Sequence, residues 1–112
     1  MALTIVHGPN ILRLLSLSDV LDCSAAAPVR ISMPAAWTAP AVLTFQVSSD
    51  NVTFEDLFDA TGHEFMVNVI PGTVVRLSSA WAVAPLFLKF RSGTRAAPVA
   101  QTANRTFTCA LA

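Results

Sequence analysis

The sequence predicts an all-β protein, an antiparallel β-sandwich or jelly roll of about seven or eight strands with an extended N-terminal segment. Apolar and polar residues alternate with a period of two, helical periodicity is nearly absent, and turn-forming residues recur at short intervals. A chain of 112 residues is long enough for one domain with a single core. We therefore expect a β-sandwich domain over residues 28–112, preceded by an N-terminal arm or edge strand over residues 1–27.

The N-terminal segment is the least regular part of the chain, because ILRLLSLSDVL (residues 11–21) suits either a strand or a short helix. We favour a strand or an extended arm, since Asp19 and Asp22 would be unfavourable in a central strand but are tolerated at an edge. Residues 29–111 already supply the strands that a sandwich needs, so we expect residues 2–21 to pack mainly on another subunit. The predicted interface consists of apolar residues of this segment and one tryptophan: Leu3, Ile5, Ile11, Leu12, Leu14, Leu15, Leu17 and Trp37.

Seven later segments show the alternation of a half-buried strand and are separated by turn residues. The clearest is LTFQV, residues 43–47, in which Leu43 and Phe45 point to one face. The predicted strands are residues 29–33, 43–47, 53–58, 65–70, 73–77, 86–91 and 105–111. Asp50 and Asn51 lie between the second and the third of them. Both residues tolerate left-handed backbone angles and therefore suit a hairpin turn.

Two segments between the strands lack the alternation. MPAAWTAPA, residues 33–41, has prolines near both ends and is expected to be a crossover with Trp37 as its apolar anchor. SGTRAAPVAQTAN, residues 92–104, has the small and polar residues of an exposed loop. Trp37, Trp81 and the seven Phe residues are expected to fill the core or an interface. The alternative for these aromatic residues is a platform on which a sugar stacks.

Charge is distributed unevenly along the chain, although the net charge is zero. Five of the seven acidic residues lie within residues 50–64, whereas residues 65–112 contain five basic residues and no acidic one. Either these two regions pair within one fold, or they are solvated, or they form complementary faces that meet between copies. A chain without net charge lacks the basic excess that is expected of a nucleic-acid-binding protein.

The composition is unusually apolar. Apolar residues make up 54% of the chain and charged residues only 12%, about half the charged fraction of an average soluble domain, so part of the apolar surface is expected to contact a neighbour. No membrane span is expected, because the best apolar stretch, residues 80–88, is interrupted by Pro85. The first residues also lack the basic and apolar regions of a secretory signal.

No residue pattern predicts catalysis, a cofactor or a metal site. His7 and His63 are far apart in the sequence and have no metal-ligand spacing. No G-x-S-x-G or comparable motif marks a nucleophile. The acidic stretch DNVTFEDLFD lacks the ligand spacing of an EF-hand. We expect Glu55 and Asp56 to face solvent, and a structural calcium ion bound through Asp50 is the alternative.

Cys23 and Cys109 lie near opposite ends of the chain. Three arrangements are open for them: two free, reduced thiols, a disulfide within the chain, or a disulfide between copies. The termini of a jelly roll often run side by side, which would allow the internal disulfide.

Short motifs resemble those of known β-sandwich proteins. LTFQVSSDNVTFEDL resembles the strand-turn-strand of galactose-binding-like β-sandwiches, although Asn51 stands where a glycine is common, and LFLKFRSG resembles a strand near the end of those domains. Together with MPAAWTAPAVLTFQVSSD and SGTRAAPVAQTANRTFT, these motifs make residues 29–111 similar to small proteins encoded by tailed bacteriophages and prophages of proteobacteria. The resemblance implies a virion component, and no enzymatic residue carries over from it.

We therefore expect a structural virion protein, most specifically a capsid decoration protein that binds the outer head lattice and stabilises it. Its partners would be copies of itself and the major capsid protein or other virion proteins, with no nucleic acid and no membrane. Its location would be the virion, assembled in the cytoplasm of the bacterial host. The alternatives are a tail or baseplate component and a carbohydrate-binding module that recognises a host surface polysaccharide. No enzyme activity, cofactor or metal is expected.

Overall fold

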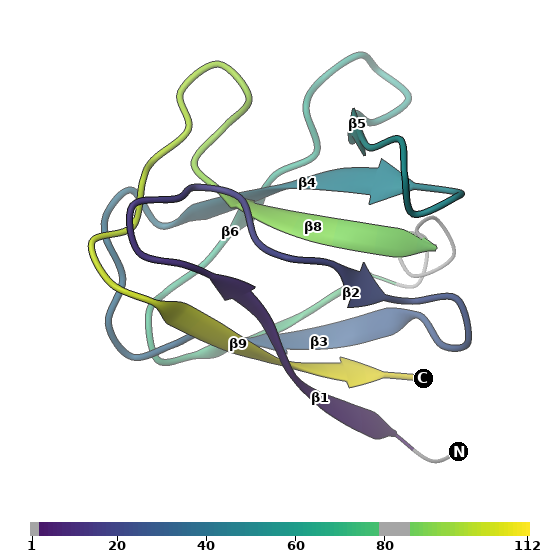
Figure 1. Ribbon diagram of the computed structural model, residues 1–112, viewed down its shortest axis with the longest axis horizontal. Coiled ribbons are helices and arrows are strands. Elements are labelled where there is room, and N and C mark those ends of the chain that lie inside the picture. Colours follow the sequence, from purple (N-terminus) through teal and green to yellow (C-terminus); the bar gives the residue numbers. More distant parts are fainter. Residues whose placement is uncertain (1–2, 79–85) are drawn as a thin grey trace.

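The computed structural model describes residues 3–78 and 86–112, which form two antiparallel β-sheets packed face to face as a sandwich (Figure 1). These residues contain nine strands and no helix. The all-β sandwich that the alternation of apolar and polar residues predicts is therefore confirmed. Two strands lie in the N-terminal segment, β1 (Thr4–Ile11) and β2 (Leu21–Asp22), and the other seven correspond to the predicted strand segments.

The strands of the described residues divide into a four-stranded and a five-stranded sheet. The first sheet has the order β1, β9 (Arg105–Leu111), β3 (Pro28–Ser32), β7 (Val74–Arg76). The second has the order β2, β8 (Phe87–Ser92), β4 (Val42–Ser48), with β5 (Glu55–Asp56) and β6 (Val67–Asn68) both paired with β4.

The strand pairing follows the winding of a jelly roll. β1 pairs with β9, β2 with β8, and β3 with β7, so that the first strand lies beside the last and each later strand beside the matching one counted from the end. β5 and β6 pair with opposite ends of β4 and together occupy the place of one strand. As a result, the two ends of the chain lie near each other at one side of the same sheet (Figure 1).

The strand bounds agree best with the prediction where the alternation is longest. The bounds of β3, β4, β8 and β9 lie within one residue of the predicted ones, whereas β5, β6 and β7 are shorter. The chain leaves the sheet after β5 and forms a loop that is closed by its own side chains. In this loop Asp59 Oδ1 accepts hydrogen bonds from the backbone N–H groups of Thr61 and His63. Local hydrogen bonding of this kind replaces the ladder that a longer strand would make.

The N-terminal segment packs within the β-sandwich of its own chain. β1 is the edge strand of the four-stranded sheet and pairs with β9 from Thr4 opposite Leu111 to Ile11 opposite Arg105. Ile11 has no exposed surface, so its predicted place in an intersubunit interface is wrong. The prediction that residues 2–21 pack mainly on another subunit is also wrong for β1 and β2. The reason is that, without β1, the backbone N–H and C=O groups along one edge of β9 would have no hydrogen-bond partners. β1 supplies these partners within the same chain.

A row of aromatic rings joins the two sheets. Phe45 of β4 contacts Phe90 of β8 edge-on with ring centroids 5.3 Å apart. Phe90 in turn contacts Phe107 of β9 at 4.9 Å, across the space between the sheets. All three phenylalanines are fully buried. Edge-on aromatic pairs add to the free energy of burying their surface, so this row is the centre of the core.

Candidate functional site

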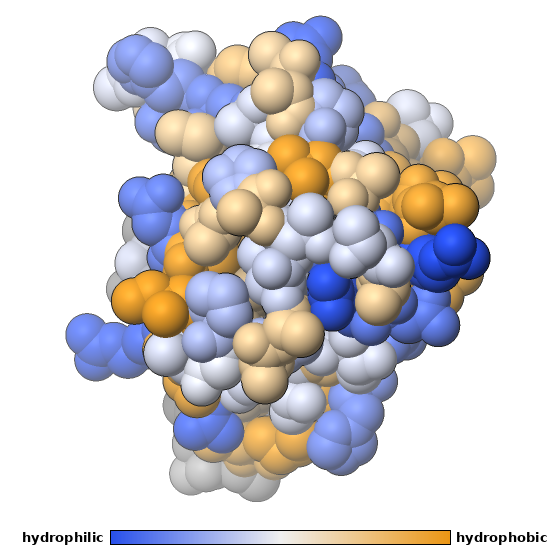
Figure 2. Space-filling view, turned by 90° about the vertical axis from the view of Figure 1, so that its left-hand side faces the viewer, coloured by the Kyte–Doolittle hydropathy of each residue, from blue (hydrophilic) through white to orange (hydrophobic). Residues whose placement is uncertain are grey.

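Three leucines project into solvent from the loop that follows β1. We call residues 12–17 the leucine loop; within it Leu12, Leu14 and Leu15 expose 54%, 64% and 51% of their surface. The loop lies at the left-hand end of the sandwich in Figure 1, and Figure 2 shows that end, where apolar patches lie among polar side chains. A cluster of large exposed apolar side chains is typical of a binding surface.

Backbone hydrogen bonds attach the leucine loop to two other segments. The N–H of Leu14 donates to the carbonyl oxygen of Gln101 at 2.7 Å, and the N–H of Gln101 donates to the carbonyl oxygen of Leu15 at 3.0 Å. The N–H of Ser92 donates to the carbonyl oxygen of Ser16 at 2.8 Å. Gln101 is itself fully buried. The exposed leucines therefore project from a backbone that is held in place.

Leu14 has an unfavourable backbone conformation. It occupies the third position of a turn that the N–H of Leu15 closes by donating to the carbonyl oxygen of Leu12 at 3.0 Å, and its φ is 71°. Glycine or asparagine is usual at such a position, and a residue with a bulky side chain costs about 1 to 2 kcal/mol there. The other non-glycine residue with positive φ among the described residues is Asn51, whose side chain suits that conformation.

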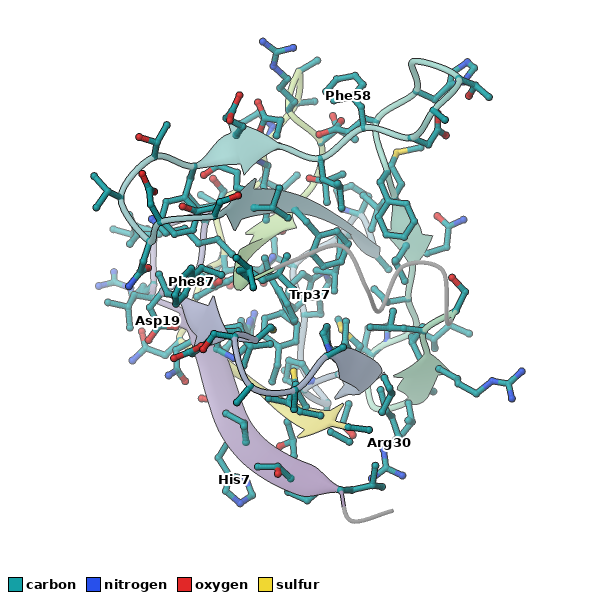
Figure 3. The ribbon with its side chains drawn as sticks, turned by 90° about the vertical axis from the view of Figure 1, so that its right-hand side faces the viewer. His7, Asp19, Arg30, Trp37, Phe58 and Phe87 are labelled. Carbon is teal, nitrogen blue, oxygen red and sulfur yellow. The ribbon has the colours of Figure 1, made fainter. Side chains whose placement is uncertain are left out.

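A hollow of about 330 Å³ opens beside the leucine loop. Its lining combines apolar and polar side chains from the end of β1 and from the β1–β2 connection: Asn10, Leu12, Leu15, Leu17, Ser18 and Asp19. Asp19 Oδ1 accepts the backbone N–H of Asn10 at 2.7 Å, which fixes the acid at the rim. Figure 3 shows Asp19 near the end of the β1 ribbon, while His7 points away from the middle of that strand. The hollow can take an apolar group whose neighbour carries a positive charge.

The structure separates the predicted interface residues into three groups. Leu3 and Ile5 are exposed like the three leucines of the loop, Leu17 is half-buried, and Ile11 is in the core. Trp37 is half-buried as well, with its ring edge-on to Phe107 at 5.6 Å. The exposed members lie at the start of the described chain (Leu3), on β1 (Ile5) and on the leucine loop.

Trp37 anchors the crossover. Its indole Nε1–H donates to the carbonyl oxygen of Pro40 at 3.2 Å, so the polar edge of the ring is used within the crossover itself. No aromatic side chain lines the hollow. The prediction for Trp81 lies outside the described residues.

The acidic and basic regions of the sequence pair within one fold. Arg91 on β8 forms ion pairs with Asp56 and, at 3.1 Å, with Glu64, and Arg95 forms one with Asp56 at 3.1 Å. Of the three interpretations of the charge pattern, the intramolecular one is confirmed for these residues. The expectation that Asp56 faces solvent is wrong, because its side chain is only 20% exposed and closes over Arg91.

The surroundings of Asp56 move its pKa in opposite directions. Partial burial raises the pKa of this carboxyl group, but hydrogen bonding and charge from Arg91, supported by Gln46 and Arg95, outweigh it, so that the pKa lies below its ordinary value. The carboxylate is therefore ionised at neutral pH. The cluster is an electrostatic contact that holds the loop after β5 against the sheet.

Asp50 closes the turn between β4 and β5. Its Oδ1 accepts the backbone N–H groups of Val52 and Thr53 at 2.9 Å, and the hydroxyl group of Ser48 donates to the same oxygen at 2.9 Å. These hydrogen bonds lower the pKa of Asp50. The prediction that Asp50 and Asn51 form the corner between two strands is confirmed. Within the described residues, no three His, Cys, Asp or Glu side chains converge to hold a metal ion.

Cys23 and Cys109 are both free thiols and both buried. Burial raises the pKa of each thiol to about 12. Both thiols are therefore protonated at neutral pH and have little nucleophilic character. A disulfide between copies would require one of these sulfur atoms to reach the surface.

No family model, curated protein or solved structure matches the chain. In the described part of the chain, no helix has the length and apolar character needed to cross a bilayer. The function is therefore inferred from the leucine loop, from the fold and from the sequence resemblance.

Proposed function

We propose that the protein is a structural subunit of a virus particle, most specifically a capsid decoration protein that binds the outer head lattice of a tailed bacteriophage and stabilises it. The observation that carries the proposal is the leucine loop, with three large apolar side chains exposed on a backbone held by hydrogen bonds. The resemblance of residues 29–111 to small phage proteins supports it. Jelly rolls also occur in viral capsid proteins, which is an argument from analogy of fold.

A fixed apolar loop suits a protein whose task is permanent attachment. Burying the exposed half of a leucine side chain stabilises a complex by about 1 kcal/mol, and three such side chains act together on the leucine loop. Because the loop is already ordered, less conformational entropy is lost on docking than a flexible segment would lose. The proposal needs no catalytic group, and the charged cluster at Arg91 is occupied by its own ion pairs.

The proposal is tested by adding purified protein to phage heads that lack the subunit. We expect the wild-type chain to sediment with the heads at a constant copy number and to raise the temperature at which they release DNA. A variant carrying Leu12→Ser and Leu15→Ser should lose most of this binding. Ile70→Ser is the matched control, since Ile70 is 67% exposed but lies between β6 and β7.

Other outcomes of this experiment separate the rival functions. Binding to isolated tails but not to heads would assign the same surface to a tail or baseplate component. Binding to neither, together with a change of tryptophan fluorescence on addition of host polysaccharide, would replace the structural role with carbohydrate recognition.

A further inference from the structure

Leu14 is unfavourable for the isolated chain in two respects. Its side chain is 64% exposed, and its φ of 71° places it in the left-handed region that disfavours a branched side chain. Strained residues of this kind persist where function requires them, so the observed outlier leads to a hypothesis about function. A glycine would remove both costs without changing the turn. What leucine adds to glycine at this position is an isobutyl group directed away from the molecule.

The hollow beside the leucine loop is suited to receive such a group. Its apolar walls are Leu12, Leu15 and Leu17, and its volume of about 330 Å³ is larger than an isobutyl group requires. Leu14 itself does not line the hollow. One loop therefore presents an apolar projection and an apolar recess next to each other.

Charged groups are arranged in the same self-complementary way. Arg13 is exposed beside Leu14, and Asp19 is exposed at the rim of the hollow. Neither side chain forms an ion pair with any residue of the described ranges 3–78 and 86–112. The positive group thus accompanies the projection and the negative group accompanies the recess.

We propose that two copies of the chain bind each other through their leucine loops, with Leu14 of each copy in the hollow of the other and Arg13 facing the partner copy's Asp19. A two-fold contact requires that one surface patch carry both halves of every interaction, and this loop does so for shape and for charge. If the partner were a different protein, this surface would need to carry only one half of each interaction. The inference rests on the proposed structural role and names the first partner of the same surface.

The test compares variants of the full chain by sedimentation equilibrium over a wide range of concentration. Wild-type protein should form a dimer, and Leu14→Gly should lose at least tenfold in association constant. In dilute solution, where both proteins are monomeric, the same variant should unfold at a higher urea concentration than wild type, because the turn is relieved. Asn51→Gly is the matched control: it changes the other non-glycine residue with positive φ and should leave association unchanged.

A charge exchange tests the orientation of the two copies. Arg13→Asp and Asp19→Arg should each weaken self-association, because each variant then brings like charges together. An equimolar mixture of the two variants should form a heterodimer, since one ion pair then keeps its native polarity and the other exists with reversed polarity. Near-ultraviolet circular dichroism checks that each variant is folded.

Two results would overturn the pairing. Wild-type protein that sediments as a monomer at the highest concentration excludes it, and so does a Leu14→Gly variant that dimerises as tightly as wild type. Sedimentation measures pairing without any particle, whereas occupancy of phage heads measures the proposed function, so that either proposal can fail while the other stands.

Discussion

Arg91 Nη1 donates to Glu64 Oε2 at 3.1 Å, and this ion pair holds the loop between β5 and β6 against the face of the five-stranded sheet. The Arg91 side chain is only 8% exposed, and a second carboxylate, that of Asp56, pairs with its other nitrogen. The cluster connects segments that no backbone ladder joins. Its contribution to stability can be measured by removing one member at a time.

Replacement of Arg91 by methionine should destabilise the fold strongly. The variant leaves the carboxylates of Asp56 and Glu64 without their main partner in a partly buried site, and breaking such a cluster typically costs about 3 to 5 kcal/mol. Arg95→Ala is the control, because the Arg95 side chain is 64% exposed and surface ion pairs contribute about 0 to 1 kcal/mol. Urea unfolding gives both values. Equal stability of the two variants would show that the cluster does not hold the loop.

Acid should destabilise the protein through carboxyl groups whose pKa values are lowered in the folded state. Hydrogen bonds lower the pKa of Asp50 and Asp59, and Arg91 lowers that of Asp56 against the effect of burial. A group with a depressed folded pKa stabilises the fold above its unfolded pKa, about 3.9 for Asp, and this contribution is lost as the pH falls through the folded value. We therefore expect the free energy of unfolding to decline below about pH 4.

The variant Asp56→Asn tests this pH dependence. Unfolding by urea at a series of pH values should show a smaller decline in the free energy of unfolding below pH 4 for the variant than for wild type. The reason is that asparagine cannot take up the proton that Asp56 binds when the protein unfolds in acid. If the two proteins lose stability in parallel, Asp56 does not contribute to the acid transition, and the pH dependence of stability arises from the other carboxyl groups with lowered pKa values, those of Asp22, Asp50 and Asp59.

The sequence predicted most where side-chain alternation decides the structure. A period of two assigns alternate residues to opposite faces, so Leu43 and Phe45 were placed in the core correctly. The same rule assigns Thr44 and Arg91 to the opposite face, yet both are buried. Asp56 and Glu64 pair with the Arg91 guanidinium, which lies against the hydroxyl group of Thr44. A local pattern contains no information about which distant side chains will cover a face.

The candidate site was only half predictable for a related reason. Apolar residues at positions 12, 14 and 15 pointed to a contact surface, but strand pairing with β9 decided that Ile11 belongs to the core. The turn at Leu14 had no local signal, because the glycine or asparagine that usually marks such a turn is missing. The hollow and the charged rim arise from the return of the chain towards β2, which is tertiary information.

Gly93 should tolerate no side chain. Its φ is 86°, and a Cβ atom at this position would lie 2.5 Å from the carbonyl oxygen of Ala97 and 2.9 Å from the backbone nitrogen of Val99. Gly93→Ala should therefore cost more than the roughly 1 to 2 kcal/mol of the backbone conformation alone. Gly62→Ala is the matched control, because Gly62 has a φ of 85° and nothing within 4 Å of the added atom. Similar unfolding midpoints for the two variants would show that the loop from Thr94 to Val99 adjusts freely.

The two thiols should be unreactive in the folded protein and should destabilise it in alkali. Burial raises the pKa of Cys23 and Cys109 to about 12, whereas an unfolded thiol titrates near 8.5. A group whose folded pKa is raised stabilises the fold below its unfolded pKa, and that contribution is lost as the pH rises from about 8.5 towards the folded value. A chromogenic disulfide reagent at pH 8 should therefore label both cysteines at once in 6 M guanidinium chloride but only slowly in native protein. The double variant Cys23→Ala, Cys109→Ala should lose less stability between pH 8 and pH 10 than wild type. Immediate labelling of the native protein by the disulfide reagent would contradict the burial of the two thiols, from which both expectations derive.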